Sequence, residues 1–185
     1  MKAFSLTKLL QIALIAVVTS FYCVSSAFAA GFQTMTHTIT VDVPHVLSIT
    51  ADTGNFTLTM ANWLSGSESD TKTVTYTVEA NDMGQADGAP AINVNLDFLY
   101  ENIALKADVG SYTKTSGNTE LAEAASGFAT IGTSNVALAN KANTTAGSNG
   151  KLLKGTLPIT YKAVATADVS SGAQLHTLYV TLTTV

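Results

Sequence analysis

Apolar and polar residues alternate along much of this chain, first and most strictly over residues 35–43. Five side chains of that segment share one face: Met35, His37, Ile39, Val41 and Val43. Threonines and Asp42 occupy the other face, and a period of two residues predicts a β-strand. Pro44 ends the pattern, because proline has no N–H to offer a neighbouring strand.

The same alternation predicts further strands, over residues 46–50, 56–60, 73–80, 92–98, 102–109, 157–161 and 176–182. Segments rich in Gly, Asn, Ser and Asp separate these strands and favour turns. Residues 110–150 alternate weakly. We expect long surface connections there, with a helical turn near residues 120–125 and a strand at residues 136–139.

Seven to nine short strands with at most one short helix predict an all-β fold. The number and spacing of the strands are typical of an immunoglobulin-like β-sandwich or a barrel. Threonine fills many of the polar strand positions, where its β-branched side chain suits the solvated face of a sheet. The composition therefore favours the β-sandwich.

The first 29 residues have the three parts of a secretory signal peptide. Lys2 and Lys8 come first, an apolar run follows over residues 9–18, and Ala27 and Ala29 supply the cleavage site. An uncleaved anchor would need about 20 apolar residues, followed by a cationic cluster that this sequence lacks. We expect cleavage after Ala29, secretion, and no stable membrane insertion of the mature chain.

Cleavage leaves 156 residues, enough for one domain with its own core. We divide them into an N-terminal strand at residues 30–45 and a β-sandwich domain at residues 46–185. The single cysteine, Cys23, lies in the leader, so burial and hydrogen bonds must hold the mature chain together without disulfides. Seven lysines, thirteen acidic residues and no arginine give a net charge of about −6, which excludes nucleic acid as a partner.

No residue pattern indicates catalysis, a cofactor or a metal. The three histidines do not have the spacing of zinc ligands: His37, His45 and His176. Glu120 and Glu123 are more typical of a solvated pair than of glycosidase carboxylates. Residues 81–88 contain oxygen ligands and glycines, but they lack the order of a calcium-binding loop, which favours a simple turn. We therefore expect a protein that is not an enzyme.

The strand at residues 35–43 has two alternative roles. It is either the first strand of its own sandwich or an extension that completes the sandwich of a neighbouring copy. In the second role the domain lacks one strand, and the neighbour's extension fills the gap by β-augmentation. Such a contact is head-to-tail and builds a filament. In the first role the five side chains of the shared face would be buried in the chain's own core.

The chain resembles the alpha class of chaperone-usher fimbrial major subunits. The resemblance rests on the size and lack of cysteine of the mature chain, on Thr-Ile-Thr-Val-Asp-Val-Pro at residues 38–44, and on the strands at residues 74–81 and 172–182. It covers most of the mature chain in order. It implies an immunoglobulin-like pilin whose N-terminal extension is the donor strand, with Met35, His37, Ile39, Val41 and Val43 as its interface residues. It also implies a homopolymer formed by strand exchange, with a periplasmic chaperone and an outer-membrane usher as partners.

The sequence thus predicts a secreted structural subunit of a surface fimbria or extracellular fibre, with an adhesive role. The alternative is a stand-alone secreted β-sandwich, such as a matrix or carbohydrate-binding module. Trp63, Tyr100 and Tyr112 could stack on sugars in that case. Trp63 follows an alternating strand, however, which favours a position in the core.

Overall fold

Valine, isoleucine and threonine fill the alternating segments because β-branched side chains fit a pleated sheet. The computed structural model describes residues 37–84, 86–143 and 150–184, and every regular element in those ranges is a strand. The strands are β1 (Leu47–Ala51), β2 (Lys72–Ala80), β3 (Pro90–Leu96), β4 (Ile103–Val109), β5 (Thr113–Gly117), β6 (Thr119–Glu123), β7 (Ala129–Thr130), β8 (Val136–Asn143), β9 (Leu153–Ala165) and β10 (Leu178–Leu182).

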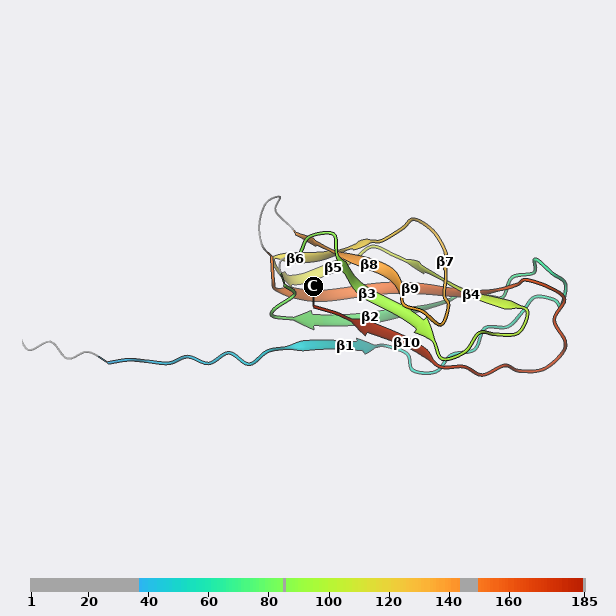
Figure 1. Ribbon diagram of the computed structural model, residues 1–185, viewed down its shortest axis with the longest axis horizontal. Coiled ribbons are helices and arrows are strands. Elements are labelled where there is room, and N and C mark those ends of the chain that lie inside the picture. Colours follow the sequence, from blue (N-terminus) through green and yellow to red (C-terminus); the bar gives the residue numbers. More distant parts are fainter. Residues whose placement is uncertain (1–36, 85, 144–149, 185) are drawn as a thin grey trace, which may run out of the picture. The chain divides into compact units, whose positions relative to one another are not determined.

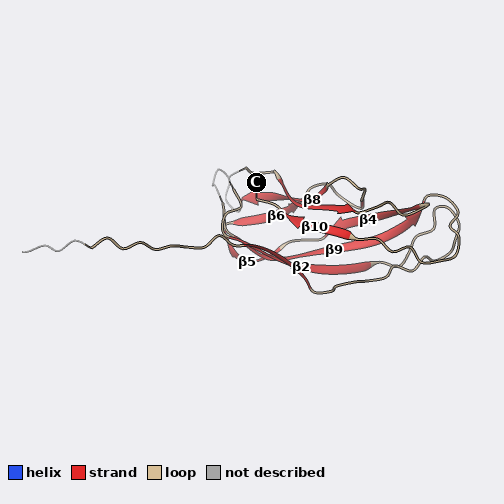
Figure 2. Cartoon of the chain, turned by 60° about the horizontal axis from the view of Figure 1, so that its bottom comes forward, coloured by secondary structure: helices blue, strands red, loops and turns tan. Residues whose placement is uncertain are grey.

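In the described part of the chain the strands form two antiparallel sheets (Figures 1 and 2). The larger sheet has the order β1-β2-β9-β4-β7, and β5 pairs with β9 on the same side as β4. The smaller sheet has the order β10-β3-β8-β6. Buried side chains from both sheets form one core between them. The all-β sandwich prediction is therefore confirmed.

The central strand β9 marks the two ends of the sandwich (Figure 1). At one end, which we call the root end, β1 begins, β2 ends and β9 begins. At the other, which we call the loop end, β9 ends and three loops meet, at residues 61–68, 97–102 and 166–177. Backbone hydrogen bonds join these loops, such as Val169 N–H to the Trp63 carbonyl and Thr166 N–H to the Asn102 carbonyl.

The core follows the alternation predicted for β2, β3 and β9. Val74, Tyr76 and Val78 are buried on β2, and every second residue of β9 is buried along its thirteen positions. The hydroxyls of Tyr76 and Tyr161 lie 2.9 Å apart inside the core and satisfy each other by a hydrogen bond. Burial raises the pKa of Tyr161 above its ordinary value. Both tyrosines therefore stay neutral and contribute to packing.

Pro158 lies in the middle of β9, where a residue without an N–H would normally break a ladder. β5 pairs with β9 up to Thr156, and β4 pairs with it from Ile159 onward. Pro158 lies between these two partners, and its carbonyl accepts the N–H of Gly110. The missing N–H thus falls at the place where the neighbouring strand changes, so no ladder hydrogen bond is lost.

Gly155 on β9 leaves room for the residues that precede and begin β5. A Cβ at this position would collide with the Thr113 carbonyl oxygen and with the Tyr112 hydroxyl. We expect Gly155→Ala to destabilise the fold by about 2–3 kcal/mol in denaturant unfolding, because backbone in a ladder cannot move aside. Gly54→Ala is the control, since its new methyl group would meet open space. Equal midpoints for the two variants would contradict this packing.

Residues 110–150 differ most from the sequence prediction. In place of long connections, the described residues of this region form β5, β6, β7 and β8. The predicted helical turn is wrong, because residues 119–123 are strand β6, which pairs with β8. The strand at residues 136–139 is confirmed and extends to Asn143. Its alternation is obscured by Lys141, which is 1% exposed and donates from Nζ to the Gly84 carbonyl at 2.8 Å.

Two aromatic side chains expected in the core are exposed. Phe98 continues the alternation of β3, but β3 ends at Leu96. Asp97 turns the chain there, because its carboxylate accepts the N–H groups of Phe98 and Thr177. Phe98 is 69% exposed as a result. Trp63, in the loop at residues 61–68, is 61% exposed, which corrects its expected core position.

Candidate functional site

β1 and β10 are outer strands, one from each sheet, as β7 and β6 are at the opposite edges. β1 pairs with β2 and β10 pairs with β3, but the described residues supply no strand to the outer edge of either. The two strands lie close to each other, one from each sheet (Figure 1). A row of unpaired N–H and C=O groups on an edge strand is a template for another strand.

The chain that follows β1 extends this unpaired edge. Residues 55–60 alternate as predicted, with Phe56, Leu58 and Met60 half-buried and the residues between them exposed. Phe56 packs on the core, its ring centroid 5.3 Å from that of Tyr161. From residue 53 to residue 58, however, the described chain provides no backbone hydrogen-bond partner. This segment has the side-chain pattern of a strand without a neighbour.

The apolar side chains of β10 are also only partly covered. Leu182 is buried, whereas Leu178 and Val180 pack against the core but remain partly exposed. We call this region the open seam: the unpaired edges of residues 47–58 and of β10, with five partly buried side chains along them, Ile49, Phe56, Leu58, Leu178 and Val180. An added strand could pair with an unpaired edge here and cover side chains along it.

The N-terminal segment carries exposed apolar side chains, as the open seam carries partly buried ones. The chain divides into two units, Met1–Asp42 and Val43–Val185, and residues 37–46 contain no strand. Three apolar side chains of the predicted interface are exposed, Ile39 by 82%, Val41 by 80% and Val43 by 72%, and His37 is exposed as well. Met35 and the predicted signal peptide lie outside the described residues. Residues 37–43 form no strand with the described residues of their own chain, so the predicted strand at residues 35–43 stays a prediction.

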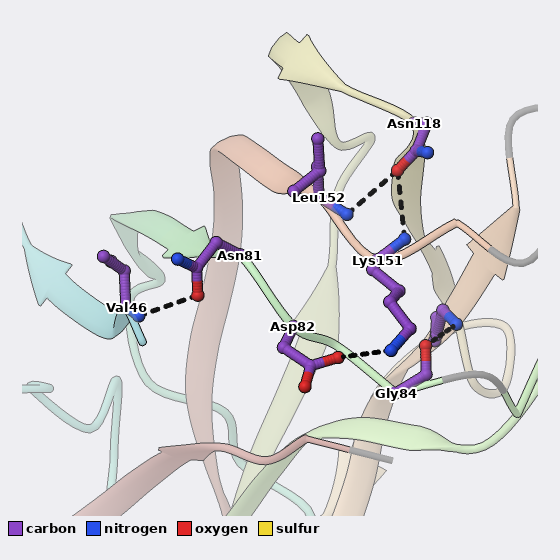
Figure 3. A network of polar contacts seen from close by, with 8 residues as sticks. Val46, Asn81, Asp82, Gly84, Asn118, Lys151 and Leu152 are labelled. Atoms are coloured by element: carbon purple, nitrogen blue, oxygen red, sulfur yellow. Dashed lines mark hydrogen bonds and ion pairs between the residues drawn. The ribbon is translucent and has the colours of Figure 1, made fainter. Parts of the chain in front are cut away.

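The point where this segment joins the domain is firmly held (Figure 3). Asn81, directly after β2, donates its N–H to the Val46 carbonyl, accepts the N–H of Val46 at 2.8 Å, and donates from Nδ2 to the Pro44 carbonyl at 2.6 Å. Three hydrogen bonds from one residue thus fix residues 44–46 to the root end. The segment before Val43 is therefore attached at a defined place.

Neighbouring polar contacts brace the same end (Figure 3). Lys151 lies 3.0 Å from Asp82, and its hydrogen bond and charge lower the pKa of that carboxyl. The Asn118 side chain accepts the N–H groups of Lys151 and Leu152. Asp87 accepts the N–H of Asn143, so both carboxylates of this connection, Asp82 and Asp87, already have partners within the chain. These contacts support the interpretation of residues 81–88 as a turn.

The groups considered for other chemistry are dispersed. In the ranges that the structure describes, no three of the residues His, Cys, Asp and Glu come close enough to hold a metal ion. Tyr112 lies beside Gly155 near the start of β9, while Trp63 hydrogen-bonds to Val169 beyond its end. A single sugar platform containing both rings is therefore not formed. Tyr100 packs edge-on against His176, with ring centroids 4.4 Å apart.

Comparisons with protein-family models, with curated proteins and with solved structures found no match for this chain. The described residues include no apolar helix of membrane-spanning length. The open seam and the exposed N-terminal segment are therefore the features from which a function can be inferred. Sequence reasoning named the segment but missed the seam residues, although their alternation was visible at residues 56–60 and 178–182.

Proposed function

We propose that this chain is a structural subunit of a surface fimbria or extracellular fibre, in which residues 35–43 of one copy fill the open seam of the next. The observation that carries the proposal is the presence, on one chain, of two unpaired edges and of an exposed alternating segment. The segment offers Ile39, Val41 and Val43 at a spacing of two residues, which is the spacing of pockets along a sheet.

The energetics favour such an insertion. Each covered Val or Ile side chain contributes roughly 1.5–3 kcal/mol, and each new backbone hydrogen bond about 1 kcal/mol. Ordering the segment costs about 1–2 kcal/mol per residue. The inserted strand can bond to β10 on one side and to residues 53–58 on the other, so it gains from both edges. Covering the partly buried Leu178 and Val180 of the accepting copy adds to the free energy gained by burying the donor side chains.

The mode of contact explains a fibre instead of a closed dimer. Segment and seam are different surfaces of the same chain, so each copy can donate to one neighbour and accept from another. The completed body would be an immunoglobulin-like sandwich. An empty seam is an aggregation hazard, which supports a periplasmic chaperone and an outer-membrane usher as partners on the way to the cell surface. An adhesive role would follow from display of the fibre there.

Two matched double variants of the mature chain test this proposal. Ile39→Asp with Val41→Asp places two charges on the face that enters the seam, and should weaken assembly by roughly 1,000-fold, because burying an unpaired charge costs several kcal/mol. Thr38→Asp with Thr40→Asp adds the same charge to the opposite face and should assemble much more normally. Fibre formation is followed by light scattering and electron microscopy over a range of concentrations.

Two outcomes of that experiment would count against the proposal. Equal assembly of both variants would mean that the apolar face is not the one that binds. Wild-type chains that remain monomeric at high concentration would mean that residues 35–43 act within their own copy, or have no strand partner at all.

A further inference from the structure

The loop end carries a second apolar surface that the open seam does not explain. Five large apolar side chains are exposed there, on all three loops: Trp63, Leu64, Phe98, Leu99 and Leu175. Leu175 is 96% exposed and Trp63 61%. Exposed apolar side chains that gather at one end of a domain are typical of an interaction surface. We call these five residues the apolar cap.

The loops beneath the apolar cap are tied to one another. Val169 donates its N–H to the Trp63 carbonyl at 2.9 Å, and Ser65 donates its N–H to Asp168 at 3.0 Å. Gln174 makes two hydrogen bonds to the backbone of Glu101, one as acceptor at 2.7 Å and one as donor at 3.1 Å. These contacts pre-organise the cap and reduce the entropy that a partner would have to remove.

The direction of the inserted strand decides what lies over the cap. β10 runs from the loop end to the root end, because it is antiparallel to β3, which begins after the turn at the root end. A strand parallel to β10 would end at the root end and bring the neighbour's body to the place where the acceptor's own segment leaves. A strand antiparallel to β10 ends at the loop end and leaves the root end free for the next contact.

Continuous head-to-tail growth therefore requires the direction antiparallel to β10. In that direction the chain of the neighbour leaves the seam at the loop end, and its residues 44–46 begin the neighbour's root end there. That root end exposes apolar side chains of its own, Leu47 and Leu152. An apolar surface on each partner and a short connection between them favour direct contact.

We propose that the apolar cap is a second contact between subunits, which covers the root end of the copy whose strand fills the adjacent seam. This inference rests on the proposed function. The seam contact alone would join subunits by one strand and leave them free to bend. The added end-to-end contact would set the angle between successive subunits and stiffen the fibre.

Trp63 is the only tryptophan of the chain, so its fluorescence reports on the cap directly. Three states of the protein are compared: the chain without residues 31–43, the same chain with its seam filled by a synthetic peptide of residues 34–44, and the wild-type fibre. Interface cores exclude water, so we expect the acrylamide quenching constant of Trp63 to fall roughly three-fold in the fibre alone, with a blue-shifted emission.

The peptide-filled monomer separates the two proposals, because it has a completed seam but no neighbouring body. A fibre whose Trp63 is as quenchable as in that monomer would overturn the cap contact and leave the fibre proposal intact. Loss of quenching in the peptide complex itself would also overturn it, since the seam would then cover Trp63. Failure of the wild-type chain to assemble would reject both proposals. Trp63→Phe with Thr73→Trp moves the reporter to an exposed position of β2, midway along β9 and away from both ends, and should keep its quenching in the fibre.

Discussion

A chain that lacks residues 31–43 is expected to fold as a soluble monomer and to form no fibres. The core consists of side chains from β2, β3, β4, β6, β8, β9 and β10, together with residues of the connecting loops. None of the described residues 37–43 belongs to a strand, and all of them are exposed. Removing them should therefore cost little of the body's own stability while removing the segment that the copy is proposed to donate. Circular dichroism and light scattering measure the two expectations separately.

Restoring the missing strand in trans is the control for that deletion. A peptide of residues 34–44 at high concentration should raise the midpoint of thermal unfolding by about 10 °C, because a ligand that binds only the folded state stabilises it. The same peptide with Ile39→Asp and Val41→Asp should have almost no effect. A truncated chain that is unfolded without the peptide and is rescued at no concentration would show that the segment belongs to its own sheet.

The sequence predicts the central strands well because their environment is simple. Residues of β2 and β9 have a buried face and a more exposed face along their whole length, so burial repeats with the pleat. The same logic fails for β6, which carries a glutamate in an ion pair with Lys114, and it finds only the first half of β8, whose second half carries a buried lysine in place of an apolar residue. Local alternation cannot reveal a polar side chain that is satisfied by a distant carbonyl.

The candidate site was only half predictable for a similar reason. The alternation of residues 35–43 indicates a strand, and the structure exposes its described apolar residues. Which edges lack a partner is a property of the assembled sheets, so the importance of Leu58 and Val180 could not be inferred from their own segments. Trp63 and Phe98 were misassigned because a chain turn, set by groups such as the Asp97 carboxylate, ends the regular pattern before them.

A mixture of two defective chains is expected to stop at a one-to-one dimer. One chain lacks residues 31–43 and retains only a seam. The other carries Leu58→Asp and Val180→Asp, which place charges along the seam, and retains only its donor segment. Each should remain monomeric alone, because one has nothing to donate and the other cannot accept. Mixed, the donor segment of the second enters the seam of the first, and neither partner can continue the fibre.

Size-exclusion chromatography with light scattering measures that dimer, and a third variant controls for damage to β10. Tyr179→Asp with Thr181→Asp adds the same total charge as the seam variant, with both groups on the exposed face of β10. It should still assemble with itself, since the side chains that line the seam are unchanged. Long oligomers in the mixture would mean that the seam is not the acceptor. If the seam variant loses its circular dichroism signal, Val180→Ser replaces it. This variant should assemble more slowly but not lose assembly completely, because the smaller polar side chain weakens the contact without burying a charge.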